Sequence, residues 1–322
     1  MILTVTPNPA LDLTWHVDRL TPGATHRVPA AAARAGGKGV NVARVLHGQH
    51  VEVLALATSG GATGAEFASE LDSSGIPHHL VPIGGATRRS IAIVDDERGE
   101  TAILNEHGAP LDAAESRALL EAASRLGRRS RVVAICGSLP PGVSPDALDA
   151  LVGGLVAAGA RVVVDTSGPG LLAAARAGAH ALKPNRDELE AATGHADLVS
   201  GARALLDLGA GLVVVSLGAE GLISVSRADG AGGLSARLPR VLHGNATGAG
   251  DALVAAIAAA LADTPDLFAE TDAAADARSR LARRAVAWSA SAVLMPLAGE
   301  LSAEREALEA EVVVEAISEE HA

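Results

Sequence analysis

The chain has 322 residues, of which 48% are hydrophobic, and its formal net charge is −12 at pH 7. This length suits one large or two small domains, and the hydrophobic share is sufficient for a buried core. The acidic charge disfavours nucleic acid as a partner, because nucleic acid attracts basic surfaces.

A cytoplasmic location is expected from the single cysteine and from the apolar runs. One cysteine, Cys136, cannot form an internal disulfide and suits a reducing compartment. Residues 1–7 lack a basic region, so we expect no signal peptide. The apolar run 252–262 is too short to span a bilayer, and we expect no membrane partner.

Buried strands and helices are expected to alternate along most of the chain. Strands that are apolar on both faces and separated by helices predict a mostly parallel sheet covered by helices on both faces. The expected strands are 2–6, 51–58, 132–136, 162–165 and 212–216. The expected helices between them are 39–47, 64–73, 112–126, 145–158 and 200–208.

Two segments interrupt this rhythm. Residues 11–33 and 87–105 alternate apolar with polar side chains, and 96–99 reads as a hairpin turn. We expect a small antiparallel sheet that stands off the main domain as a lid, with an ordinary edge hairpin as the alternative. Its exposed edges could pair with a second copy of the chain, which makes a homodimer possible.

From residue 248 onward the pattern is helical. Helices are expected over 249–262 and 273–293. In the Glu-rich tail 302–322, apolar residues recur at helical spacing around Leu308, Val312 and Ile317.

Lysine and asparagine are scarce and lie in short motifs. The two lysines are Lys38 and Lys183, and the five asparagines are Asn8, Asn41, Asn105, Asn185 and Asn245. A residue type that a compositional bias nearly removes should persist where no other residue can replace it. These motifs are therefore candidates for a functional site.

The strongest motif is Asn245-Ala246-Thr247-Gly248-Ala249-Gly250-Asp251, which leads into a predicted helix. Glycines allow close approach of a ligand, and the helix N-terminus offers free amides to a phosphoryl group. Asp251 in the first turn could accept a proton from a substrate hydroxyl. The alternative is that Asp251 only caps the helix.

Two further motifs could serve phosphates and a metal. In Gly36-Gly37-Lys38-Gly39, Lys38 is a point charge suited to phosphate. Asn185 and Glu188, which open another predicted helix, could hold the water shell of Mg²⁺. They also fit a capping box, and the two interpretations are compatible.

Three loops follow predicted strands, where the ligands of open α/β sheets bind. They are 137–142 with Ser138, 216–221 with Ser216, and 8–12 with Asp12, whose carboxylate could accept hydrogen bonds from sugar hydroxyls. The histidines show no metal-ligand spacing.

Taken in order, these motifs, with Thr87-Arg88 and Asn105-Glu106-His107-Gly108 between them, resemble those of the ribokinase-like (phosphofructokinase B) carbohydrate kinases. The resemblance implies an α/β, ribokinase-like three-layer sandwich. It implies one kinase domain over 1–322, with a β lid formed from about 11–35 and 84–107. It further implies an ATP-dependent sugar-phosphate kinase that uses Mg²⁺.

The resemblance also implies a role for each matching residue. Asp251 would be the general base, and Gly248, Ala249 and Gly250 would supply amides to the transferring group. The implied sugar-phosphate residues are Asp12, Gly37, Lys38, Asn41, Arg88 and Ser138. The implied nucleotide residues are Lys183, Asn185, Ser216, Gly218, Gly221, Asn245 and Thr247. Asn185 and Glu188 would hold the metal, through water.

Departures from the family pattern leave the acceptor open. Ser90 and Ala92 stand where this branch often carries Asn and Lys, and His107 stands where Pro is common. The resemblance favours D-fructose 1-phosphate, phosphorylated at O6, with tagatose 6-phosphate or another sugar as the alternative. A non-catalytic sugar-phosphate sensor is the alternative of another class. A dinucleotide oxidoreductase is disfavoured, because no Gly-x-Gly-x-x-Gly follows the first strand.

Overall fold

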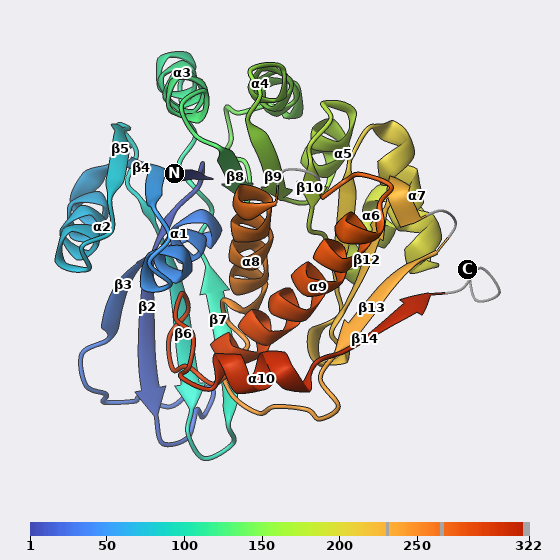
Figure 1. Cartoon of the computed structure of the whole chain (residues 1–322). Helices are drawn as coiled ribbons and strands as arrows, with labels where there is room; N and C mark the ends of the chain where they lie inside the picture. Colours follow the sequence, from blue (N-terminus) through green and yellow to red (C-terminus); the bar gives the residue numbers. More distant parts are fainter. Residues whose placement is uncertain (230–231, 265–266, 318–322) are drawn as a thin grey trace.

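A ten-stranded, mostly parallel sheet forms the centre of the computed structural model, which describes residues 1–229, 232–264 and 267–317 (Figure 1). Its strand order is β14-β13-β12-β11-β10-β9-β8-β1-β4-β5. The parallel strands are β1 (Ile2–Thr6), β4 (Val53–Ser59), β5 (His78–Pro82), β8 (Val132–Cys136), β9 (Arg161–Asp165), β10 (Ala181–Leu182) and β11 (Leu212–Ser216). The last three are antiparallel: β12 (Leu222–Ser226), β13 (Gly233–Arg237) and β14 (Val313–Ile317).

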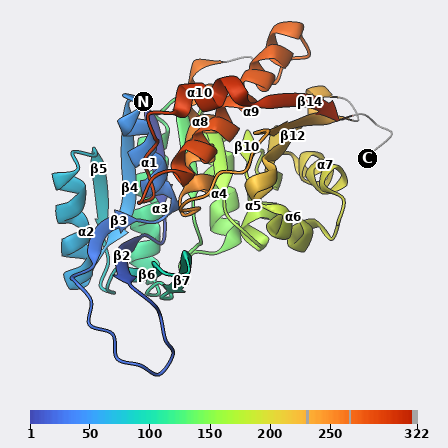
Figure 2. The same cartoon turned by 90° about the horizontal axis from the view of Figure 1, so that it is seen from below.

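Helices cover both faces of this sheet, as the apolar strands predict. Along β1, Ile2 faces one buried cluster and Leu3 the other, because successive side chains of a strand point to opposite faces. One face packs on α1 (Lys38–Gly48), α2 (Gly61–Ser73), α8 (Ala249–Asp263), α9 (Asp272–Val293) and α10 (Arg305–Glu311). The other packs on α3 (Ala113–Gly127), α4 (Pro145–Ala157), α5 (Pro169–Arg176), α6 (Arg186–Thr193) and α7 (Leu198–Leu208) (Figure 2).

A second sheet of four strands projects beyond the carboxyl ends of the parallel strands (Figure 1). It consists of β3 (Ala32–Gly36), β2 (Ala10–Val17), β6 (Arg88–Asp95) and β7 (Glu100–Asn105), in that order. The expected hairpin is present as β6 and β7, but the expectation of a purely antiparallel sheet was wrong. The strands β2 and β6 pair in parallel, Ala10 with Arg88, because the chain forms α1, β4, α2 and β5 between them.

The expected helix over 302–322 was also wrong beyond its first half. Helix α10 ends at Glu311, and the chain then pairs with β13 as the edge strand β14. Residues 318–322 of that prediction lie outside the described residues. The helical spacing was misleading because Leu308 packs from the helix, whereas Val314 packs from the strand that follows it.

The strand order places a topological switch between β1 and β8. From β1 the chain proceeds to β4 and β5 on one side, and β8 starts the other side. Ligands of open α/β sheets bind outside the carboxyl ends of strands at such a switch. Within the described part of the chain, no helix is long and apolar enough to cross a membrane.

Candidate active site

Helix α8 begins with a turn that can bind an anion. Its N-cap, Gly248, has a φ of 85°, and a Cβ there would lie 2.7 Å from the Cβ of Ala298, so only glycine fits. The amide of Ala249 already donates to the carbonyl of Ala246. The next two amides, of Gly250 and Asp251, belong to the turn that an α-helix leaves unpaired. They remain available for an anion.

Asp251 lies buried at this turn and is held by one specific partner. The side-chain amide of Asn41, in the first turn of α1, donates to Oδ2 of Asp251 at 2.8 Å. Burial raises the pKa of Asp251 to about 6, and the negative charge of Asp165 adds to the rise. A carboxylate with this pKa is mostly ionised at neutral pH and is suited to accept a proton.

Both lysines of the chain contact the same buried carboxylate. Asp165, at the end of β9, is 1% exposed, and its Oδ1 lies 3.0 Å from Nζ of Lys38 and 3.4 Å from Nζ of Lys183. Burial alone would lower the pKa of Lys38, but the charges of Asp165 and Glu188 outweigh it and raise that pKa. Lys38 is therefore a permanent positive charge at the carboxyl edge of the sheet.

A cavity of about 600 Å³, here called the small-sheet cavity, opens between the second sheet and the α8 turn. Lys38 and Arg88 supply its positive charge, while Asp12 and Asp251 supply carboxylates. Burial raises the pKa of Asp12 to about 7, although the charge of Arg88 opposes the rise. The other polar side chains of its lining are Asn8, Asn41, Ser90, Asn105, Glu106, His107, Ser138 and Thr247.

The groups of this cavity are held in place by the loop after β1. The carbonyl of Asn8 accepts hydrogen bonds from Nε and Nη2 of Arg88, each at 3.3 Å, and the Asn8 amide donates to Ser138 at 3.0 Å. Gly36 is required beside Asp12, because a Cβ at Gly36 would come within 1.9 Å of the carboxylate. The scarce Asn8 thus positions a cation instead of contacting the centre of the site.

A second cavity of about 410 Å³, here called the α9 cavity, lies on the other side of the α8 turn. Four predicted nucleotide residues line it: Asn185, Ser216, Gly218 and Gly221. Arg240 is the charged side chain of its lining and forms two hydrogen bonds, of 2.8 and 3.1 Å, with Glu311 at the end of α10. The apolar part of the lining is Ala219, Leu238, Leu242, Ala246, Ala249, Leu253, Val286, Ala290 and Val293.

Asn185 and Glu188 form the predicted capping box of α6. The Asn185 side chain accepts from the Glu188 amide at 2.7 Å, and Glu188 accepts from the Asn185 amide at 2.9 Å. Each side chain keeps further oxygen lone pairs, and Glu188 lines a third cavity of about 220 Å³ beside Lys38 and Ser138. In residues 1–229, 232–264 and 267–317, no group of three or more His, Cys, Asp or Glu side chains could hold a metal ion.

Three of the predicted nucleotide residues lie elsewhere than in the lining of the α9 cavity. Thr247 lines the small-sheet cavity. The Asn245 amide donates to the carbonyl of Pro296 at 3.0 Å, and its oxygen accepts from the amide of Thr247, so Asn245 shapes the loop before α8. Lys183 is buried against Asp165, and its Nζ would lie 3.7 Å from a Cβ at Gly250. Lys183 therefore adds charge next to the α8 turn.

Sequence reasoning missed Asp165 and Arg240. Asp165 ends the run Arg161–Asp165, where it reads as the last residue of a buried strand. A carboxylate at the carboxyl end of a strand, opposite two motifs that each carry a lysine, was the signal available. Arg240 had no comparable signal, because it lies in an irregular loop and meets its partner Glu311 only through the fold.

Phosphoryl transfer requires a base, groups that bind the transferring anion, and room for a molecule on each side. Asp251 and the amides of α8 stand between the small-sheet cavity and the α9 cavity, and two lysines lie beside them. The fold and the site together define a phosphotransferase.

Comparison with known proteins identifies the family. The model of the pfkB family of carbohydrate kinases matches residues 6–301. The 1-phosphofructokinase of Xanthomonas campestris pv. campestris is 42% identical over 81% of this chain and 84% of that protein. The ATP-dependent 6-phosphofructokinase isozyme 2 of Mycobacterium tuberculosis is 33% identical over 81% of this chain and 77% of that protein.

Among solved structures, phosphofructokinase-2 from Escherichia coli in complex with fructose-6-phosphate superposes with a TM-score of 0.83 at 28% identity. The match covers 96% of this chain and 98% of that chain. The chain belongs to the pfkB family of carbohydrate kinases. It is a phosphotransferase that has an alcohol group as acceptor and ATP as its co-substrate.

Replacing Asp251 by Asn should lower kcat by at least ~10²-fold, the low end for a lost general base. In the unmodified protein, kcat/KM for the acceptor should fall as pH decreases through about 6, because the base acts only when ionised. The Asn41 hydrogen bond can persist to the new amide oxygen, so the fold should be kept. Steady-state rates from pH 5 to 8 for both proteins measure this; near-normal turnover by the variant would refute the base assignment.

Proposed function

We propose that the chain phosphorylates D-fructose 1-phosphate at O6 with ATP, which yields D-fructose 1,6-bisphosphate and ADP. The observation that carries the proposal is the position of Asp251 between a charged cavity and an apolar one. The 42% identity to a 1-phosphofructokinase, against 33% to a 6-phosphofructokinase isozyme, supports this acceptor.

The acceptor would lie in the small-sheet cavity. Lys38 and Arg88 offer positive charge for its phosphate, and Ser138 offers a hydroxyl. Asp12, with Gly37 and Asn41 beside it, would bind sugar hydroxyls. The remaining free hydroxyl, O6, would then approach Asp251.

At the reacting centre, O6 attacks the γ-phosphorus of ATP as Asp251 takes the O6 proton. A bond forms between O6 and the γ-phosphorus, and the bond from that phosphorus to the ADP oxygen breaks. The amides of Gly250 and Asp251 and the Lys183 ammonium would offset the charge of the transferring group. Asn41 orients the base through its hydrogen bond to Oδ2.

The nucleotide would occupy the α9 cavity. Its apolar lining suits a purine base, and the glycines at 218 and 221 let a nucleotide approach the backbone closely. Ser216 and Asn185 would add hydrogen bonds. Asn245 and Thr247 would act through the loop that joins this cavity to the α8 turn.

Mg²⁺ fits the oxygen donors of Asn185 and Glu188. Both side chains keep lone pairs after closing the capping box, and Glu188 lies beside a cavity that can hold water. These two residues would hold the ion through water molecules. When bound, the ion would neutralise charge on the nucleotide phosphates.

The second sheet would act as a lid over the acceptor. Its residues Arg88, Ser90 and Asn105 line the small-sheet cavity, so closure would exclude water from the transfer. Of the departures from the family pattern, Ser90 and His107 face the cavity and could therefore select the acceptor.

A panel of acceptors in an ADP-release assay tests the proposed function. We expect kcat/KM for D-fructose 1-phosphate to exceed that for D-fructose 6-phosphate and D-tagatose 6-phosphate by at least ~10-fold, the scale of one well-placed contact. Unphosphorylated fructose should be poorer still, because Lys38 and Arg88 would lose their partner. A preference for either 6-phosphate would transfer the assignment to that sugar, and no turnover with any sugar would favour the sensor.

The lid also offers a surface for a second copy of the chain. All six residues of β7 are exposed at the sheet edge, and Ile103 and Leu104 are 51% and 56% exposed. We propose a homodimer through this edge, because unpaired edge strands with apolar side chains favour pairing. Light scattering should give twice the chain mass, and replacing Leu104 by Lys should reduce it to one; a monomeric native protein would contradict the proposal.

A further inference from the structure

The segment 293–302, between α9 and α10, lies against the loop that precedes the α8 turn. The carbonyl of Val293 accepts from the amide of Asn245 at 2.9 Å, and the carbonyl of Pro296 accepts from its side chain at 3.0 Å. Ala298 leaves no room for a Cβ at Gly248. We call residues 293–302 the strap, because they run from the α9 cavity toward the second sheet.

The far end of the strap is tied back to α9, the helix from which the strap starts. The Ser302 amide donates to the hydroxyl of Ser291 at 2.7 Å, and the two hydroxyls lie 3.1 Å apart. Ser291 is fully buried. A displacement at the start of the strap, next to α9, should therefore also move its end at Ser302.

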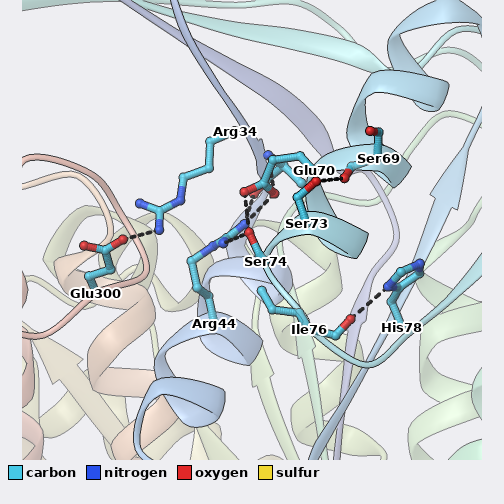
Figure 3. Close-up of polar contacts among 10 residues, drawn as sticks. Arg34, Arg44, Ser69, Glu70, Ser73, Ser74, Ile76, His78 and Glu300 are labelled. Carbon is cyan, nitrogen blue, oxygen red and sulfur yellow. Dashed lines mark hydrogen bonds and ion pairs between the residues drawn. The ribbon is translucent and has the colours of Figure 1, made fainter.

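At its far end the strap contacts two arginines. Glu300 forms an ion pair with Arg34 of β3, and Figure 3 shows these two side chains reaching toward each other from the strap and the second sheet. Gly299 packs against Arg44 of α1, since a Cβ at this glycine would lie 2.8 Å from Cδ of Arg44.

The strand β3 is tied to helices α1 and α2 just beside this ion pair. Glu70 of α2 accepts from the amide of Ala35 at 3.0 Å. It also accepts from Nη2 of Arg44 at 2.7 Å, a contact that Figure 3 shows. The same Nη2 donates to the carbonyl of Ala35 at 3.2 Å. Ala35 is therefore held by α1 and α2, and Arg34, its neighbour in β3, forms the ion pair with the strap.

Asp12 depends on the position of this strand. Asp12 of β2 pairs with Arg34 of β3, and the Asp12 carboxylate lies against Gly36. A small rotation of β3 about Ala35 would move Arg34 together with Gly36, the residue that lies against the Asp12 carboxylate.

We propose that the Arg34–Glu300 ion pair couples the nucleotide side of the site to the acceptor side. The first residue of the strap, Val293, lines the α9 cavity together with Gly244 and Ala246 of the loop before α8. Gly244 packs directly against Val293. A nucleotide in the α9 cavity therefore fixes the strap. The strap then holds β3 and Asp12 in the arrangement that binds the acceptor. Glu300 and Arg34 are positioning residues in this scheme, which rests on the proposed placement of the two substrates.

The test measures how strongly one substrate improves the binding of the other. The apparent dissociation constant of the acceptor is determined with and without a saturating non-hydrolysable ATP analogue, and the ratio of the two is the coupling factor. We expect Glu300→Ala to reduce this factor by ~2–5-fold, the value of a partly exposed ion pair. Saturated kcat should change less than ~2-fold, because neither residue touches the reacting atoms.

Two further variants separate a specific loss of coupling from general damage to the protein. Glu309→Ala removes a carboxylate of α10, whose side chain has no ion pair among the described residues, and should leave the factor unchanged. The swapped pair Arg34→Glu with Glu300→Arg should restore at least part of it. An unchanged factor in Glu300→Ala, or an equal loss in Glu309→Ala, overturns the proposal.

The control with the unmodified protein separates this proposal from the proposed function. The acceptor used is whichever sugar phosphate the unmodified protein turns over best. If D-fructose 1-phosphate is not that sugar, the functional assignment fails while the coupling can still be measured. If the unmodified protein shows a coupling factor of one, the inference fails and the functional assignment stands.

Discussion

The buried carboxylate of Asp165 brings together charges that would otherwise repel. Lys38 is the first residue of α1, which follows β3, and Lys183 directly follows the short strand β10. Two ammonium groups within 3.4 Å of one oxygen are stable at this depth only because the oxygen is charged. Since β9 ends at Asp165, the parallel sheet itself fixes the point where positive charge is concentrated in an acidic protein.

The remaining parts of the site are arranged around this point. The α8 turn carries Asp251, whose raised pKa arises from burial and from the nearby charge of Asp165. The small-sheet cavity lies on the Lys38 side and the α9 cavity on the side of Gly250, close to Lys183. One carboxylate thus influences the base and both lysines, so the two cavities share a single electrostatic centre.

The sequence was informative where a single segment determines its own structure. The apolar runs located five of the buried strands to within two residues, although they missed β12, and the capping box of Asn185 and Glu188 formed as its spacing predicts. It was misleading where distant segments must meet: the parallel pairing of β2 with β6 and the edge strand β14 depend on the whole chain. The scarce lysines indicated the site, but that both of them pair with Asp165 depends on the fold, because the three residues come from distant segments.

Replacement of Asp165 by Asn tests the claim of a shared centre most directly. Lys38 would lose a charge-assisted hydrogen bond worth roughly 1.5–3 kcal/mol and Lys183 would lose its ion pair, so KM should rise by about tenfold or more for the acceptor and for ATP together. Replacement of Lys38 by Ala is the matched comparison and should raise KM mainly for the acceptor. A folded Asp165→Asn protein with both KM values unchanged, or with only one raised, would contradict the account.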